Sequence, residues 1–278
     1  MRVSSRQLYW RPAAAAAALL GLSAAAFAET PQDRFWAGLE YFYPTISSTA
    51  HIDATATARP GTSISLEDEL DLSDRKGTPY VNLGMRLGEN WRLEFEYYSL
   101  KRTAAKTLGR QIEWGDTTFP VGANLESKFD STIYRITGGW SWLKTQQAEA
   151  GIGFGLHITD FKTQLSGQGT GILTGTGFQR EAHDALVPLP TVGLYGSYAV
   201  APQVTLRGRV DFLSLKYQDY DGRLMNWMAA VDWRFAKNVG IGAGYRYVDY
   251  KLEATKSDFT GEVRYKFKGP TIFVNAGF

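Results

Sequence analysis

The strongest constraint on this chain is a regular alternation of apolar and polar side chains along short segments. Between residues 204 and 212 the even positions are apolar or glycine, and the odd positions are Thr205, Arg207, Arg209 and Asp211. Successive side chains of a β-strand point to opposite faces, so a period of two predicts a strand with one apolar and one polar face. The two segments that follow, 225–233 and 239–247, keep the same period.

Ten segments with this pattern run along the chain. They are residues 35–43, 81–87, 91–97, 134–142, 150–156, 192–198, 204–212, 225–233, 239–247 and 259–278. In the last segment the alternation changes phase at Gly269-Pro270, and because proline cannot donate to a β-ladder we expect a β-bulge there. The sequence therefore predicts an all-β fold of about ten antiparallel strands, with eight or twelve as alternatives.

The lengths of the connections indicate how these strands are arranged. Every second link is short, at 88–90, 144–147, 201–203 and 236–238. The other links are long at about 46–77, 102–129 and 162–187 and shorter at 219–222 and 254–258, and we expect the Gly/Ser/Thr-rich stretch Ser166–Gly177 to be a mobile loop. Short turns at one end and long loops at the other are typical of a closed transmembrane β-barrel, and an even strand number returns the C-terminus to the turn end.

Aromatic residues are sorted by strand end. One set lies beside the short turns or the C-terminus: Trp91, Trp140, Trp142, Tyr198, Trp233, Phe235 and Phe278. A second set lies toward the long loops: Tyr43, Tyr97, Tyr134, Phe212, Tyr245, Tyr247 and Tyr265. Aromatic girdles at two lipid–water interfaces produce this distribution. A soluble β-sandwich also has alternating strands, but nothing in that fold sorts aromatic residues by strand end.

The N-terminus has the pattern of a cleavable secretory signal. Residues 1–12 carry three arginines and no acidic residue, an Ala/Leu-rich run follows, and Ala26-Phe27-Ala28 is a small-x-small cleavage site. We expect cleavage after Ala28, which leaves residues 29–278 as a single barrel domain. The chain has no cysteine, and its net charge of +2 is too small to indicate nucleic-acid binding.

The last strand adds a family resemblance. Its segment Gly269–Phe278, with apolar residues at alternate positions and a terminal aromatic, resembles the C-terminal signature of Gram-negative outer-membrane β-barrel proteins. The chain is similar in size to the OmpA membrane domain, OmpW-like proteins and omptins. The resemblance implies an outer-membrane location, with the long loops extracellular and the short turns and C-terminus periplasmic. It also implies that the barrel-assembly machinery reads Phe278. The segment Gly61–Leu72 resembles stretches of barrel proteins that carry no assigned chemistry.

The polar face of the strands predicts a charged lumen. The inward set is Glu40, Arg86, Arg92, Glu94, Glu96, Arg135, Glu149, Arg207, Arg209, Asp211, Asp232, Arg234, Arg246, Glu262, Arg264 and Lys266. A barrel of this size is only slightly wider than the eight-stranded barrels that side chains just fill, so we expect these charges to pair and plug the lumen. The alternative is a narrow porin-like channel for small solutes, in which the arginines favour anions.

Candidate catalytic groups are few. His157 should face inward, whereas His183-Asp184 and His51-x-Asp53 fall in predicted long loops, and no G-x-S-x-G context accompanies them. We assign no catalytic residue, cofactor or metal site and expect no enzymatic activity. A hydrolase or protease at the rim, acting on lipid A or peptides, is the alternative in another class. The expected role is structural or surface-interacting, with at most a narrow polar lumen.

Cations gather near the long-loop ends of the strands. They are Lys101, Arg102, Lys106, Arg110, Lys162, Lys216, Lys251 and Lys256. Positive charge at that level suits the phosphates of lipopolysaccharide. We therefore expect outer-membrane lipids and lipopolysaccharide as partners, and the sequence leaves the oligomeric state open.

Overall fold

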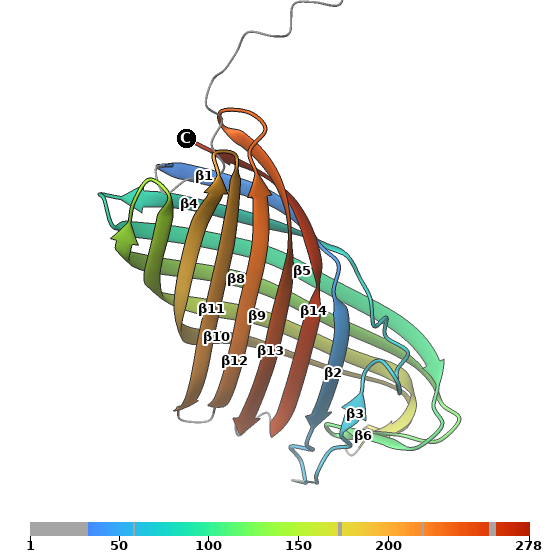
Figure 1. Cartoon of the computed structure of the whole chain (residues 1–278). Coiled ribbons are helices and arrows are strands. Elements are labelled where there is room, and N and C mark those ends of the chain that lie inside the picture. The colour runs from blue at the N-terminus through green and yellow to red at the C-terminus, as the bar shows by residue number, and fades with distance from the viewer. Residues whose placement is uncertain (1–32, 58, 172–173, 218–219, 256–259) are drawn as a thin grey trace, which may run out of the picture.

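A single antiparallel sheet makes up the structure, a computed structural model that describes residues 33–57, 59–171, 174–217, 220–255 and 260–278 (Figure 1). The expected signal segment, residues 1–28, and the expected start of the last strand at Phe259 lie outside these ranges. Within them, no helix has the length and hydropathy to cross a membrane. The strands are β1 (Phe35–Phe42), β2 (Thr45–Ile52), β3 (Ile64–Ser65), β4 (Thr78–Leu87), β5 (Trp91–Thr107), β6 (Ile112–Trp114), β7 (Thr117–Phe119), β8 (Asn124–Lys144), β9 (Ala148–Gly171), β10 (Gly175–Ala201), β11 (Val204–Tyr217), β12 (Tyr220–Trp233), β13 (Val239–Thr255) and β14 (Thr260–Gly277).

Ten of the described strands close a ring. Their order is β1-β4-β5-β8-β9-β10-β11-β12-β13-β14, and β1 also pairs with β14, with Leu39 opposite Val274. The predicted ten-stranded antiparallel barrel is confirmed. β2 continues β1 beyond Tyr43-Pro44 and pairs with the other half of β14, so these two segments together form one wall strand.

The two ends of the barrel differ as predicted. We call the end with the short links the turn end; there Gly88 takes a φ of 72° that suits glycine. Phe278 lies at this end, where its carbonyl accepts a hydrogen bond from Phe35 N at 3.0 Å. We call the opposite end the hairpin end.

Two of the expected long loops are largely β-structure. β9 and β10 pair continuously from Gly171–Gly175 to Ala148–Tyr198, so the prediction of a mobile loop over Ser166–Gly177 is wrong for its described residues. β5 and β8 likewise extend to Thr107 and Asn124, with β6 and β7 between them. The composition of Ser166–Gly177 indicates a loop, but small polar residues also occur in strands, where the side-chain environment decides whether they are tolerated.

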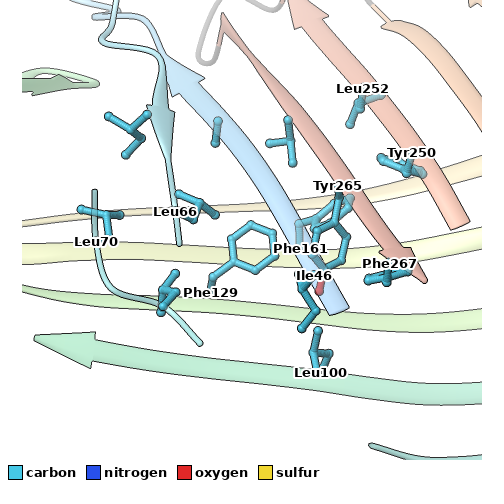
Figure 2. Close-up of a cluster of buried hydrophobic side chains, with 14 of the residues drawn as sticks. Ile46, Leu66, Leu70, Leu100, Phe129, Phe161, Tyr250, Leu252, Tyr265 and Phe267 are labelled. Atoms are coloured by element: carbon cyan, nitrogen blue, oxygen red, sulfur yellow. The ribbon is translucent and has the colours of Figure 1, made fainter. Parts of the chain in front are cut away.

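The polarity of the barrel reverses halfway along its axis. In the turn half, apolar and aromatic side chains are exposed on the outer face and charged side chains lie inside. In the hairpin half, the interior is an apolar core that includes Leu100, Phe129, Phe161, Tyr250 and Tyr265 (Figure 2). The Phe129 ring lies 5.3 Å from Tyr265 and 6.0 Å from Phe161, distances typical of favourable aromatic pairs.

This reversal explains the phase change in the last strand, where the prediction of a bulge is wrong. β14 keeps an unbroken register with β13 through Gly269 and Pro270, and its odd-numbered residues face inward along the whole length. Tyr265, which we expected in an outer girdle, is buried inside the barrel. The backbone therefore keeps its phase, and the medium on each side of it changes.

The wall divides at the hairpin end. β10 pairs with β11 only from Val192–Phe212 toward the turn end, and its remaining residues pair with β9 alone among the described strands. Pro188 and Pro190 lie just beyond this point, and neither can donate a hydrogen bond to a strand on that side. The sheet of β5, β8, β9 and β10 consequently slants away from β11–β14 (Figure 1).

The apolar core predicts a large effect of one substitution. Phe129→Ala removes a ring that is 1% exposed, and we expect a loss of about 3–5 kcal/mol in the free energy of unfolding. Urea unfolding in detergent, followed by tryptophan fluorescence, measures this loss. The matched control is Phe178→Ala, because Phe178 is 68% exposed at the same end. Equal destabilisation by the two substitutions would contradict the buried core.

Candidate functional site

The polar interior of the turn half contains most of the residues predicted to line the lumen. Thirteen of the sixteen face inward there: Glu40, Arg86, Arg92, Glu94, Glu96, Arg135, Glu149, Arg207, Arg209, Asp211, Asp232, Arg234 and Arg246. The prediction is wrong for Glu262, Arg264 and Lys266, which lie on the outer face of β14 opposite Val263, Tyr265 and Phe267. Their side chains belong to the half in which the outer face is polar.

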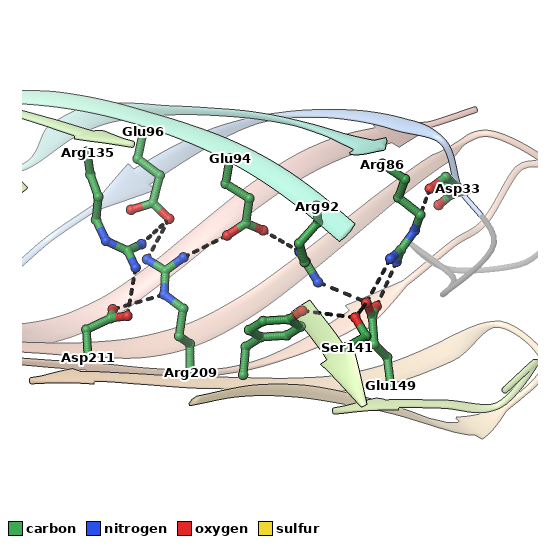
Figure 3. Close-up of polar contacts among 11 residues, drawn as sticks. Asp33, Arg86, Arg92, Glu94, Glu96, Arg135, Ser141, Glu149, Arg209 and Asp211 are labelled. Carbon is green, nitrogen blue, oxygen red and sulfur yellow. Dashed lines mark hydrogen bonds and ion pairs between the residues drawn. The ribbon is translucent and has the colours of Figure 1, made fainter. Parts of the chain in front are cut away.

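At the turn end, Arg86 and Glu149 form a bidentate ion pair across the lumen. Both Arg86 Nη atoms donate to the carboxylate at 2.7 Å, and Arg86 Nε donates to the Asp33 carbonyl at 2.9 Å (Figure 3). Ser141 Oγ donates to Glu149 Oε1 at 2.6 Å. Both charges are almost fully buried, and this set of partners offsets the cost of removing them from water.

The network continues toward the middle of the barrel through alternating charges. Arg92 contacts Glu149 at 3.4 Å and also pairs with Glu94, to which Arg209 donates at 3.0 Å. From there, Arg209 reaches Glu96 at 2.6 Å (Figure 3).

A four-membered group completes the network. Arg209 Nε lies 3.1 Å from Asp211, and Arg135 bridges Glu96 at 2.9 Å and Asp211 at 2.8 Å (Figure 3). These side chains come from β5, β8 and β11, so the ion pairs connect separate parts of the wall.

Three further pairs use the remaining inward charges. Arg246 donates to both oxygens of Glu40 at 2.5 and 2.9 Å and lies over the Tyr80 ring, 4.2 Å from its centroid. Arg234 pairs with Asp33 at 2.5 Å, and Arg207 pairs with Asp232 at 3.1 Å. Asp33 was missed at the sequence level because it precedes the first alternating segment. With Asp33, the seven arginines of this interior face seven carboxylates, so these groups carry no net charge.

Little space remains between these groups. The two cavities that they line have volumes of about 50 and 60 Å³, which is room for a few water molecules. A Cβ at Gly151 would lie 2.2 Å from Tyr195 Cζ, so glycine at this wall position allows the tyrosine ring to fill the lumen.

The link between β2 and β4 covers the interior at the hairpin end. Leu66, Leu70 and Leu72 of this link are buried in the apolar core. Glu67 pairs with Arg102, whose side chain is fully buried, and Arg102 Nη2 donates to Ser48 Oγ at 2.8 Å. Arg102 was predicted among the cations at the long-loop end that suit lipopolysaccharide phosphates; it lies at that end, but its side chain is buried in the interior, so it is not available to them. Extending the even-numbered alternation of β5 past Glu96 would have placed it inside.

The three histidines do not converge. His157 is on β9, opposite Arg135 of β8, and its side chain is buried in the barrel interior. His51 lies on the outer face of β2. His183 and Asp184 point to opposite faces of β10. In the described residues, no group of three or more His, Cys, Asp or Glu side chains is arranged to hold a metal ion.

Glu181, and not Asp184, supplies the carboxylate beside His183. His183 Nε2 is 3.1 Å from Glu181 Oε1, and Glu181 Oε2 accepts a hydrogen bond from Thr117 at 3.0 Å. Burial would raise the pKa of nearby Asp116, but hydrogen bonds from the Ala56 amide and the Thr55 hydroxyl outweigh burial and hold that pKa below its usual value. This small cluster lies at the hairpin end, away from the lumen network.

The network predicts that a single broken partner is costly. Arg135→Ala leaves Glu96 and Asp211 without one of their buried cations, and we expect a loss of about 3–5 kcal/mol in the free energy of unfolding. Urea titration in detergent, read by the shift of the folded band on unboiled gels, measures the loss. The control is Lys128→Ala on the same strand, because Lys128 is an exposed lysine whose pair with Asp130 should contribute at most about 1 kcal/mol. The network assignment fails if the two variants unfold at the same urea concentration.

Comparison with known structures finds several outer-membrane proteins to which this chain is similar. The outer membrane protease OmpT from Escherichia coli is 10% identical, with 90% of this chain and 98% of that chain covered at a TM-score of 0.59. Lower TM-scores of 0.36 and 0.32 relate the chain to Ail of Yersinia pestis (7% identity; 86% and 99% covered) and to the toluene transporter TodX of Pseudomonas putida (9% identity; 88% and 90% covered). At 10% identity the likeness to OmpT shows the fold alone.

A comparison with curated protein sequences finds no match. A family model described as the outer membrane protein beta-barrel domain matches residues 14–267, which is most of the chain. The closed ten-stranded ring has the architecture that this description names. The chain therefore belongs to the outer membrane β-barrel protein family.

Proposed function

We propose that this protein is a non-conducting outer-membrane barrel whose role is carried by its extracellular surface. One observation supports this proposal above the others: among the described residues, paired charges occupy the interior of the turn half and an apolar core occupies that of the hairpin half, with only small cavities between the charges. Export by the signal at residues 1–28 and recognition of Phe278 by the barrel-assembly machinery are parts of the same proposal.

The outer surface supports an orientation in the membrane. Exposed apolar side chains cover the turn half, bounded by Trp91, Trp140 and Trp233 at one edge and by Tyr97 and Tyr134 at the other. A membrane-crossing strand needs only about 9–11 residues. β10 has 27 residues, so its hairpin half extends well beyond the lipid. With the turn end in the periplasm, the hairpin half stands outside the cell.

On the outer face, charged side chains lie on the hairpin side of the apolar band. Lys128, Lys162 and Lys266 lie there, each 3.3 Å from an aspartate of the same or the neighbouring strand. We propose that these lysines also contact lipopolysaccharide phosphates, because an ammonium group can pair with both kinds of anion.

The charge balance of the lumen argues against an anion channel. An open anion pathway needs uncompensated positive charge, whereas the seven arginines here face seven carboxylates. An ion that passed this network would then meet the apolar core around Phe129 and Tyr265, where desolvation is costly.

A rim-sited hydrolase is the second candidate, and the His183–Glu181 pair is the observation that favours it. The pair lies beside an apolar pocket of about 30 Å³, and a protein of the same fold, OmpT, is a protease. No nucleophile of the described residues accompanies His183 in a recognisable arrangement, so we favour the surface role. Product analysis with lipopolysaccharide and peptide substrates, comparing the wild type with His183→Ala, separates the two candidates.

A planar lipid bilayer tests the closed lumen. We expect no stepwise current from the purified protein, and none from Arg207→Ala or Arg246→Ala, because the apolar core closes the hairpin half in each. Heat-modifiable migration of the same samples on detergent gels is the control for folding. Reproducible conductance steps from folded wild-type protein would contradict the proposal.

A further inference from the structure

One edge of the extracellular wall lacks a neighbouring strand. From Gly175 to Thr191, β10 pairs with β9 on one side, and no described strand pairs with it on the other. The unpaired stretch is far longer than an ordinary strand of about five or six residues. A long free edge is a template for another strand, because its backbone N–H and C=O groups remain available.

The hydrogen-bonding groups of the even-numbered residues face this open side. In an antiparallel ladder each residue directs both its N–H and C=O to one neighbour, and successive residues alternate. The carbonyl of His183, an odd-numbered residue, faces β9, where it accepts a 3.4 Å hydrogen bond from Thr163 Oγ1. The even-numbered side chains, from Phe178 to Leu186, are exposed on the outer face.

The edge is complementary to itself. If two copies pair antiparallel with Ala182 opposite Ala182, Arg180 lies opposite Asp184 of the second copy, and Phe178 lies opposite Leu186. Phe178 and Leu186 are 68% and 64% exposed, so each would cover an apolar side chain that now faces water. Opposite charges and apolar pairs at facing positions stabilise antiparallel strands, and two-fold symmetry makes each contact twice.

Prolines set the limit of this pairing. Pro188 lies opposite Thr176 in the proposed register, and Pro190 follows it toward the barrel wall. Neither residue donates to the edge, so the free ladder is confined to the part of β10 that stands outside the lipid.

We propose that this edge binds the same edge of a second copy of the chain, in an opposing membrane. The two-fold axis of an antiparallel strand pair is perpendicular to the sheet, and the sheet of β8–β10 continues the barrel wall (Figure 1). The axis therefore lies in the membrane plane, which turns the second barrel to face the first. The inference rests on the proposed surface role and gives that role a partner: the protein itself on a neighbouring cell.

Cross-linking between two vesicle populations tests this pairing. The chain has no cysteine, and Ala182→Cys brings two thiols together across a hydrogen-bonded pair with Cα atoms about 5.5 Å apart, within the range of a disulfide. One population carries a longer, tagged chain, so a mixed dimer is recognised by its size. We expect mixed dimers from Ala182→Cys and none from Glu126→Cys, an exposed position on β8 of the same sheet.

Charge reversal provides a second arm that does not depend on a disulfide. Arg180→Asp or Asp184→Arg alone should weaken vesicle clustering by about tenfold, since two repulsive pairs replace two attractive ones, and the double variant should restore it. Clustering that is unchanged in the single variants, or a double variant that stays impaired, overturns the proposal. Mixed dimers that fail to form, or disulfide dimers that form only within one population, overturn it as well.

Ion flux through the same vesicles is measured in parallel. Conducting vesicles would refute the proposed closed barrel, whereas vesicles that are tight to ions and do not cluster would refute only the edge pairing.

Discussion

The buried charges of the turn half can exist only as members of pairs. Each lies inside a wall one strand thick, with lipid-facing apolar side chains on the other side, and an isolated charge in such a place is costly. Arg135, shared between Glu96 and Asp211, and Arg86, held by Glu149, meet this requirement with short, multiply bonded contacts. Because the partners lie on different strands, the same contacts hold the ring together and occupy the space that a channel would need.

In the hairpin half the two faces of the same strands exchange their polarity. Water replaces lipid on its outer face, so charged side chains such as Arg264 and Lys266 lie outside, while Tyr265 and Phe267 pack inside. Arg102, a charged group taken into this core, again has partners, in Glu67 and Ser48. In the closed barrel that we propose, the paired charges of the turn half and the apolar core of the hairpin half would each block the interior, in two physically different ways.

The sequence predicted the ring and most of the lumen because alternation is a local property. Val204–Phe212 and its neighbours showed their two faces without any tertiary information, and thirteen of the sixteen residues that this pattern predicted to face inward do so. The errors share one cause. Glu262, Arg264, Lys266, Tyr265 and Arg102 lie beyond the lipid, where polarity no longer reports which face is inward. Their placement follows from carrying the phase of the turn half along the whole strand, as for Arg102 in β5, and not from the local polarity.

The separation of β10 from β11 at the hairpin end could not be predicted from the alternation for a different reason. Pro188 and Pro190 signal an edge in β10, but strand patterns alone do not show which neighbour is missing. The sequence also does not predict the His183–Glu181 contact, because two residues separated by one position share a face in a strand and the length of this link indicates a loop.

The constant phase of β14 places its inward residues in both halves of the barrel. Spin labels on single cysteines at positions 265, 266, 272 and 273 in vesicles, tested with lipid-soluble oxygen and a water-soluble nickel chelate, measure which medium each position meets. We predict that position 272 is accessible to oxygen, position 266 to the nickel chelate, and positions 265 and 273 to neither. Oxygen access at position 265 together with burial at position 266 would show that the strand changes phase, and would contradict the account.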